Sequence, residues 1–144
     1  NRLRNEFVFK PLGEFASQKG LVFEVKKGNE GPAILFKKQN WSHYITVTRD
    51  AGRDSDWKNL YIGVSESYKS AGEDRTLPRV QLSCFSGPDS ANNEWWPYGS
   101  EWLPCKDWHS TSSYLPMQTG EVANWIISKV TQIIEEIESR DLPM

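Results

Sequence analysis

The sequence predicts an α+β fold: an antiparallel sheet of five or six strands covered by a long C-terminal helix, with an N-terminal helical segment. Three observations predict it. Apolar residues recur at helical spacing near the N-terminus and again over residues 118–140. Short segments between them have strand character, and turn-forming residues separate these segments. An antiparallel sheet with one apolar face needs a cover of this kind.

The first helical segment is expected over residues 2–18. Its apolar residues fall roughly at helical spacing; they are Leu3, Phe7, Val8, Leu12, Phe15 and Ala16. Pro11 lacks an N–H donor, so it predicts two helical pieces or a kink. Gly20 is a natural residue for the end of this segment.

Segments with strand character follow. They span residues 21–27, 33–37, 41–48, 60–65 and 80–85. Most alternate apolar and polar positions, and the first two predict a hairpin with a loop of about five residues. A further short strand around residues 94–98 cannot lie in the centre of the sheet, because Pro97 has no N–H to donate.

The C-terminal helix is expected over residues 118–140. Its apolar residues recur every three or four positions, and polar residues occupy the opposite face. Thr119 is the expected N-terminal cap, and Glu121 is suited to the first turn because of the helix dipole. Pro143 cannot continue the helix.

The composition is that of one globular domain spanning residues 1–144. A formal net charge of −2 does not support nucleic-acid binding by the whole domain, although a local basic patch is compatible with it. No run of about 18 apolar residues predicts a transmembrane helix. The chain lacks an initiating Met and a signal peptide, so we expect the C-terminal fragment of a longer, cytoplasmic protein.

Cys84 and Cys105 are the only cysteines, and their spacing is not that of a zinc site. Two reduced, buried thiols are the favoured interpretation for a cytoplasmic chain. A single disulfide between them is the alternative.

Residues 93–108, NEWWPYGSEWLPCKDW, concentrate tryptophan as no other stretch does. Such rings either fill the gap between sheet and helix, against Trp125, or form a surface that binds bases, sugars or a peptide. We expect a mixed role, in which the corner at residues 97–99 and Trp102 stay exposed. The candidate binding residues are Trp95, Trp96, Tyr98, Trp102 and Trp108.

Glu24 and Lys26 flank Val25 on an expected strand and form E-x-K, half of the PD-(D/E)XK nuclease centre. There the carboxylate holds Mg²⁺ and the lysine orients water, but a second acid is needed to complete the metal site. The upstream stretch has no Asp, and its acids, Glu6 and Glu14, fall on the expected helix. An exposed strand edge, which Lys26 protects from aggregation, is therefore the favoured interpretation.

Other chemical patterns are less specific. His43 and His109 have hydroxyl neighbours, but no G-x-S-x-G frames a serine, so structural roles are expected for both. Residues 50–56 carry aspartates spaced as in part of a calcium loop, yet residue 61 is Tyr instead of the required Glu. Neither type of phosphate-binding glycine loop occurs in the sequence. The residues alone predict no metal or cofactor site.

The order of several aromatic motifs resembles the C-terminal region of bacterial proteins in the PD-(D/E)XK nuclease superfamily, over about residues 33–138. These motifs are W-x-x-Y-I at 41–45, L-Y-I-G-V at 60–64, W-W-x-Y at 95–98, Trp108, and T-G-E at 119–121 before an Ile-rich helix. The resemblance implies that the catalytic Asp and E-x-K lie upstream of this chain. It therefore transfers no catalytic residue here, and it implies Mg²⁺ only for the parent protein.

The expected function is a non-catalytic binding or regulatory domain of a nuclease-like protein, in the context of defence against foreign DNA. Its partner would be nucleic acid or another protein, with no membrane contact. The first alternative is a small ligand- or carbohydrate-binding module that uses exposed aromatic residues. The second is a divergent nuclease that uses Glu24 and Lys26, with Glu14 as a displaced acid.

Overall fold

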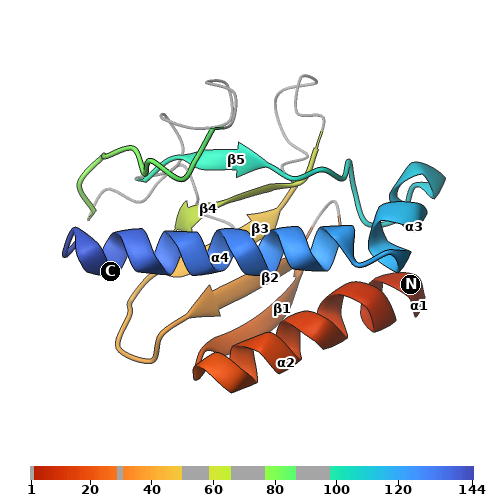
Figure 1. The fold of residues 1–144 in the computed structure, drawn as a ribbon, viewed down its shortest axis with the longest axis horizontal. Helices are drawn as coiled ribbons and strands as arrows, with labels where there is room; N and C mark the ends of the chain where they lie inside the picture. Colours follow the sequence, from red (N-terminus) through yellow and green to blue (C-terminus); the bar gives the residue numbers. More distant parts are fainter. Residues whose placement is uncertain (1, 29–30, 50–58, 66–76, 87–97) are drawn as a thin grey trace.

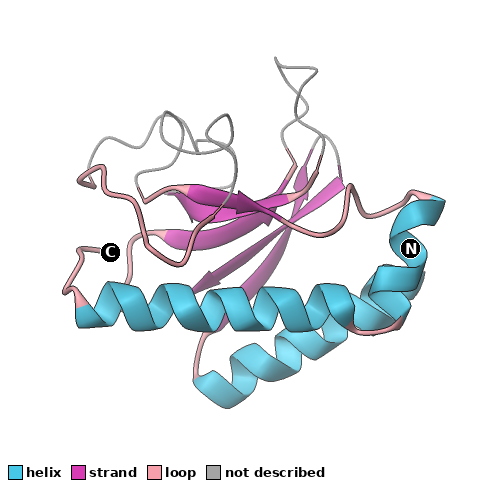
Figure 2. Cartoon of the chain, turned by 45° about the horizontal axis from the view of Figure 1, so that its top comes forward, coloured by secondary structure: helices cyan, strands magenta, loops and turns pink. Residues whose placement is uncertain are grey.

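A computed structural model describes residues 2–28, 31–49, 59–65, 77–86 and 98–144. It confirms the α+β class, with a sheet of five antiparallel strands and helices from both ends of the chain. Figure 1 shows the long helix α4 and the N-terminal helix α2 lying across the same face of the sheet. In Figure 2, where the top of the molecule is turned toward the viewer, the sheet is seen above this pair of helices.

The N-terminal segment is helical from Arg2 to Lys19. It consists of α1 (Arg2–Arg4), the π-helical turn η1 (Asn5–Phe9) and α2 (Lys10–Lys19). The irregularity expected from Pro11 takes the form of this π-helical turn, in which the N–H of Lys10 donates to the carbonyl of Asn5. Gly20 ends α2 as expected, in the left-handed conformation at φ 68°.

The sheet is a meander in the order β1-β2-β3-β4-β5. Its strands are β1 (Val22–Gly28), β2 (Gly31–Lys37), β3 (Tyr44–Thr48), β4 (Tyr61–Ser65) and β5 (Ser100–Trp102). The first four lie where the predicted segments do, but β3 begins only at Tyr44 and β2 begins already at Gly31. The predicted hairpin loop of about five residues is wrong, because Gly28 of β1 pairs directly with Gly31 of β2. The pairing of Phe23 with Phe36 and of Phe36 with Ile45 aligns the apolar residues that face the helices.

The predicted strand at residues 80–85 is wrong: the segment turns at Ser83 and Cys84, and β5 takes the fifth position. The carboxylate of Glu136 on α4 supplies the reason. It accepts hydrogen bonds from the backbone N–H groups of Ser83 (2.7 Å) and Cys84 (3.0 Å) and from the Ser83 hydroxyl (2.8 Å). A side chain from the helix thus satisfies donors that a neighbouring strand would otherwise satisfy.

Lys129 of α4 and Arg140, which follows the end of that helix, hold the same segment. The Lys129 ammonium donates to the carbonyl of Cys84 at 2.7 Å and forms an ion pair with Glu101 of β5, and both partners of this pair are only 12% exposed. Arg140 donates to the carbonyl of Gln81 at 3.2 Å and pairs with Glu136 at 2.8 Å. Polar contacts therefore join α4 to one end of the sheet.

The C-terminal region holds two helices instead of one, so the predicted start of the long helix is wrong. These are α3 (Thr111–Gln118) and α4 (Glu121–Ser139). Gly120, at φ 84°, caps α4, while the hydroxyl of the expected cap Thr119 donates to the carbonyl of Pro116. The apolar stripe of α4 is buried as expected; it comprises Val122, Ile126, Val130, Ile133 and Ile137.

Candidate functional site

The E-x-K pair lies on the edge strand β1. The ammonium of Lys26 is 3.9 Å from the Glu24 carboxylate, and the side chains are 48% and 37% exposed. The hydroxyl of Tyr44 donates to Glu24; burial raises the pKa of Tyr44, and the negative charge and hydrogen bond of Glu24 add to this shift. The pair is thus a solvent-exposed contact on a strand edge, in the environment that the sequence predicts.

Glu14 does not complete this pair. Phe23 packs toward α2, since a side chain at Gly13 would contact its ring at 3.7 Å, and its neighbour Glu24 therefore points to the opposite face of the sheet. Glu14 is exposed on α2, which covers the face occupied by Phe23. Within the described residues, no three His, Cys, Asp or Glu side chains form a group suited to a metal ion.

Trp108, a candidate binding residue, lies in the core at 1% exposure. Its indole N–H donates to the carbonyl of Pro32 at 2.9 Å, and its ring meets Phe9 edge-to-face at 5.6 Å. A Cβ at Gly31 would lie only 3.2 Å from the indole. Trp108 therefore connects the β1–β2 hairpin to the N-terminal helix.

The expected exposure at residues 97–99 is wrong for the two residues described there. Tyr98 has 0% exposure and Gly99 is buried. The Tyr98 hydroxyl donates to the carbonyl of Pro143 at 2.5 Å, while the Tyr98 carbonyl accepts from the N–H of Leu82. Of the remaining candidates, Trp102 is partly exposed and meets Tyr61 edge-to-face at 6.0 Å, whereas Trp95 and Trp96 lie outside the described residues.

His109 belongs to a polar cluster centred on Asp107, which is 3% exposed. The Asp107 carboxylate accepts from the N–H groups of His109 (3.0 Å) and Ser110 (2.7 Å) and from the Ser110 hydroxyl (2.5 Å). Burial opposes ionisation of Asp107, but these hydrogen bonds outweigh it and lower its pKa. Asp107, not His109, bonds to Ser110, so the arrangement stabilises the entry to α3 and is not a nucleophile–base pair.

His43, at 7% exposure, holds the end of the described chain. Its Nδ1 is 2.9 Å from the carbonyl oxygen of Met144, which also accepts from the N–H groups of Ser42 (2.8 Å) and His43 (3.1 Å). Both histidines thus have the structural contacts expected for them. The aspartates of residues 50–56 lie outside the described residues.

Neither cysteine forms a disulfide; Cys105 is buried and Cys84 is partly buried. Burial raises the pKa of both thiols, and the nearby charge of Glu136 helps to raise that of Cys84 to about 12. Since the thiolate is the reactive form, we expect iodoacetamide at pH 8 to modify Cys84 on the order of a hundredfold more slowly in the native chain than in urea. Mass spectrometry of timed samples measures this, and rapid native labelling of Cys84 would contradict it.

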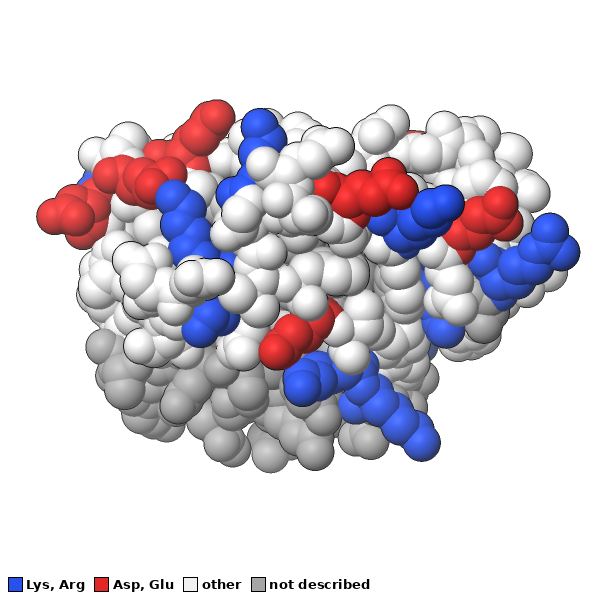
Figure 3. Space-filling model, turned by 90° about the horizontal axis from the view of Figure 1, so that it is seen from below, with Lys and Arg blue, Asp and Glu red and all other residues white. Residues whose placement is uncertain are grey.

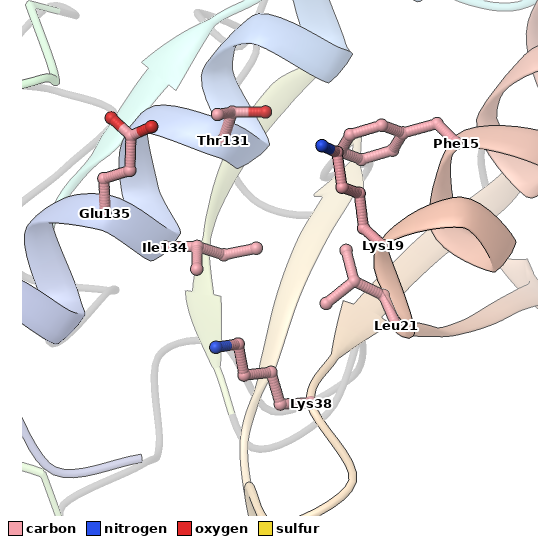
Figure 4. A pocket seen from close by; sticks show the side chains of 7 residues that line it. All are labelled: Phe15, Lys19, Leu21, Lys38, Thr131, Ile134 and Glu135. Carbon is pink, nitrogen blue, oxygen red and sulfur yellow. The ribbon is translucent and has the colours of Figure 1, made fainter.

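A groove of about 210 Å³ opens between α2 and α4. The side chains of Phe15, Leu21 and Ile134 form its apolar walls, and Lys19, Lys38, Thr131 and Glu135 complete its lining. Figure 4 shows Lys19 and Lys38 with their ammonium ends on either side of Ile134.

Local structure positions these groups. The left-handed turn at Gly20 and the bond from the Leu21 N–H to the Ala16 carbonyl, at 2.8 Å, hold Leu21 beside the end of α2. The Lys38 ammonium forms an ion pair with Glu138 at 2.6 Å, which joins the end of β2 to α4. Thr131 donates to the carbonyl of Ile127 at 2.8 Å, so its hydroxyl already has a partner within α4. The groove is therefore a product of packing between distant segments.

Sequence reasoning missed this groove. Lys19 and Lys38 stand at the ends of a helix and a strand, where lysines are ordinary, and Ile134 belongs to the apolar stripe expected on α4. The partial exposure of Ile134 is the one property that the sequence pattern leaves open.

The chain matches no protein-family model, no curated protein and no solved structure. Its described helices include none with the length and apolar character needed to cross a membrane.

Proposed function

We propose that this chain is a non-catalytic binding domain of a PD-(D/E)XK nuclease-like protein. The observation that carries the binding role is the groove between α2 and α4, where the partly exposed Ile134 lies with Phe15 and Leu21 beside charged side chains. Openings with apolar walls and a few polar groups are the usual form of a ligand site. The nuclease context, and with it a role in defence against foreign DNA, is supported by the resemblance of the aromatic motifs alone.

Three buried or partly buried carboxylates support a non-catalytic role because structural contacts already occupy them. Glu136 holds the turn at Ser83, Asp107 holds the entry to α3, and Glu101 pairs with Lys129. Figure 3 shows that, among the described residues, basic and acidic side chains are interspersed on the face that lies lowest in Figure 1, without a continuous basic patch. The described part of that face offers no extended site for a nucleic-acid backbone.

We also propose the alternative of a small-ligand-binding module, but at a different site from the one that the sequence predicts. Tyr98 and Trp108 are buried, so the groove takes the place of the aromatic rings as the proposed site. The nuclease alternative gains no support from Glu14, which lies over the face of the sheet opposite to Glu24.

We expect no Mg²⁺-dependent cleavage when this chain is incubated with linear and supercoiled DNA. The reason is that Glu24 and Lys26 form an exposed pair on a strand edge, where they contact each other at 3.9 Å. Gel electrophoresis measures the cleavage, with Lys26→Ala as the test variant and Lys27→Ala as the matched control. Cleavage that persists in Lys27→Ala and disappears in Lys26→Ala would overturn the non-catalytic assignment.

Binding in the groove is tested with an uncharged probe, 1-hexanol, followed by NMR. We expect the methyl signals of Leu21 and Ile134 to shift, because these side chains form the apolar walls. The variant Ile134→Trp fills the groove and should abolish the shift at Leu21. Wild-type signals that do not respond would contradict a binding role for the groove.

A further inference from the structure

We infer that the groove between α2 and α4 binds a small carboxylate with an apolar body, whose anionic end lies against Lys19. The inference rests on the proposed binding function and specifies the ligand that the same site selects.

The size of the groove limits the ligand to a short chain or a single ring. The groove, at about 210 Å³, is smaller than the sites of about 300–1,000 Å³ that hold drug-sized molecules, so it suits a body of about six to eight heavy atoms.

The walls select an apolar body. Phe15 and Leu21 are each only 9% exposed, so they are fixed parts of the core surface, and Ile134 is partly exposed beside them. A hydrocarbon chain placed here removes further apolar surface from water without leaving a buried polar group unpaired. A strongly polar ligand body would gain nothing from these walls.

The lysine at the α2 rim favours an anion. The lining contains two lysines and one glutamate, and Glu138 lies beside it as the partner of Lys38. Lys38 already pairs with Glu138, whereas Lys19 takes part in no ion pair with any described residue. A carboxylate beside Lys19 would gain a charge-assisted hydrogen bond.

The position of Lys19 favours an approach from the open side of the groove. Lys19 is exposed in the last turn of α2, and Figure 4 shows its ammonium end beside the groove. Glu135 extends from α4, so its negative charge disfavours an anion at the α4 rim of the groove. The carboxylate is therefore expected at the α2 rim, with the hydrocarbon body toward Ile134.

Three probes with the same hydrocarbon body test the inference: hexanoate, 1-hexanol and hexylammonium. Titrations followed by the methyl signals of Leu21 and Ile134 give each dissociation constant. We expect hexanoate to bind with a dissociation constant on the order of a few millimolar, as suits so small a ligand. It should bind up to about fivefold more tightly than 1-hexanol, the upper end of the range for an exposed ion pair, and hexylammonium should bind most weakly.

Matched variants test which side chain lies against the carboxylate of hexanoate. Lys19→Gln should weaken hexanoate to the level of 1-hexanol, whereas Lys10→Gln, on the same helix but outside the lining, should leave it unchanged. Glu135→Gln should leave hexanoate binding equal or make it tighter, because a like charge is removed. The preference for hexanoate should also shrink as salt is raised.

The outcomes separate the two proposals. Equal binding of hexanoate and 1-hexanol, or a preference for hexanoate that survives Lys19→Gln, would overturn the carboxylate inference while the groove remains a binding site. Failure of all three probes to shift the groove signals would overturn both.

Discussion

Replacing Trp108 with Ala is expected to lower the free energy of unfolding by about 3–5 kcal/mol, the range for removing a large aromatic side chain from a core. The ring is 1% exposed, contacts Phe9 and donates a hydrogen bond to Pro32. The substitution therefore removes packing from two segments at once and leaves the Pro32 carbonyl without this donor. Urea unfolding followed by circular dichroism measures the change.

A milder variant keeps this prediction testable if the Ala variant does not fold. Trp108→Phe retains most of the apolar ring but removes the N–H donor, so it should cost about 1–3 kcal/mol. Trp102→Ala serves as the comparison, because Trp102 is partly exposed and should lose less stability than Trp108→Ala. A loss below about 1 kcal/mol for Trp108→Ala would show that the ring is not part of the core.

Acidification is expected to destabilise the chain through Glu136, whose ordinary pKa is 4.5. Burial opposes its ionisation, but hydrogen bonds from Ser83, Arg140 and Cys84 outweigh burial and lower the pKa in the folded chain to about 2. The stabilisation from the ionised group is therefore complete above about pH 4.5 and is lost as the pH falls toward 2. Its size at neutral pH is on the order of 3 kcal/mol.

The variant Glu136→Gln isolates this effect. At pH 7 it should lower the free energy of unfolding by about 1–3 kcal/mol, and stability should fall less steeply than in the wild type between pH 4.5 and 2. Glu138→Gln is the matched control on the same helix: Glu138 is 56% exposed, so its loss should cost less than about 1 kcal/mol. An unchanged pH profile for Glu136→Gln would disprove this role of Glu136. Unfolding curves measured at several pH values give both quantities.

The pattern of apolar and polar residues predicted the fold correctly where residues close together in the sequence determine the structure. The β1–β2 hairpin follows from two apolar segments around a turn, and the stripe of α4 follows from its helical spacing. The pattern failed at residues 80–85, because the donors of Ser83 and Cys84 are satisfied by Glu136, some fifty residues further along the chain. No local signal in the segment reveals such a distant partner.

The region before α4 shows a second case in which the sequence pattern did not predict the structure. Helix α3 contains Pro116 and serines, so its propensity is poor, and buried Asp107 stabilises its entry through the N–H of Ser110. Tyr98 was expected at an exposed corner because of Pro97 and Gly99, yet its hydroxyl meets the carbonyl of Pro143 inside the fold. The groove likewise joins residues of α2 and α4, which only the tertiary structure brings together.

The order in which the layers are synthesised has a consequence for folding in the cell. The strands β1 to β4 end at Ser65, whereas α4, which covers their apolar face, is complete only at Ser139. At roughly 5–20 residues per second, a ribosome needs about 4–15 s to add the intervening residues. During that interval Ile34, Ile45 and Ile62 lack their final cover, so this sheet face is exposed to molecular chaperones and to aggregation until the last helix emerges.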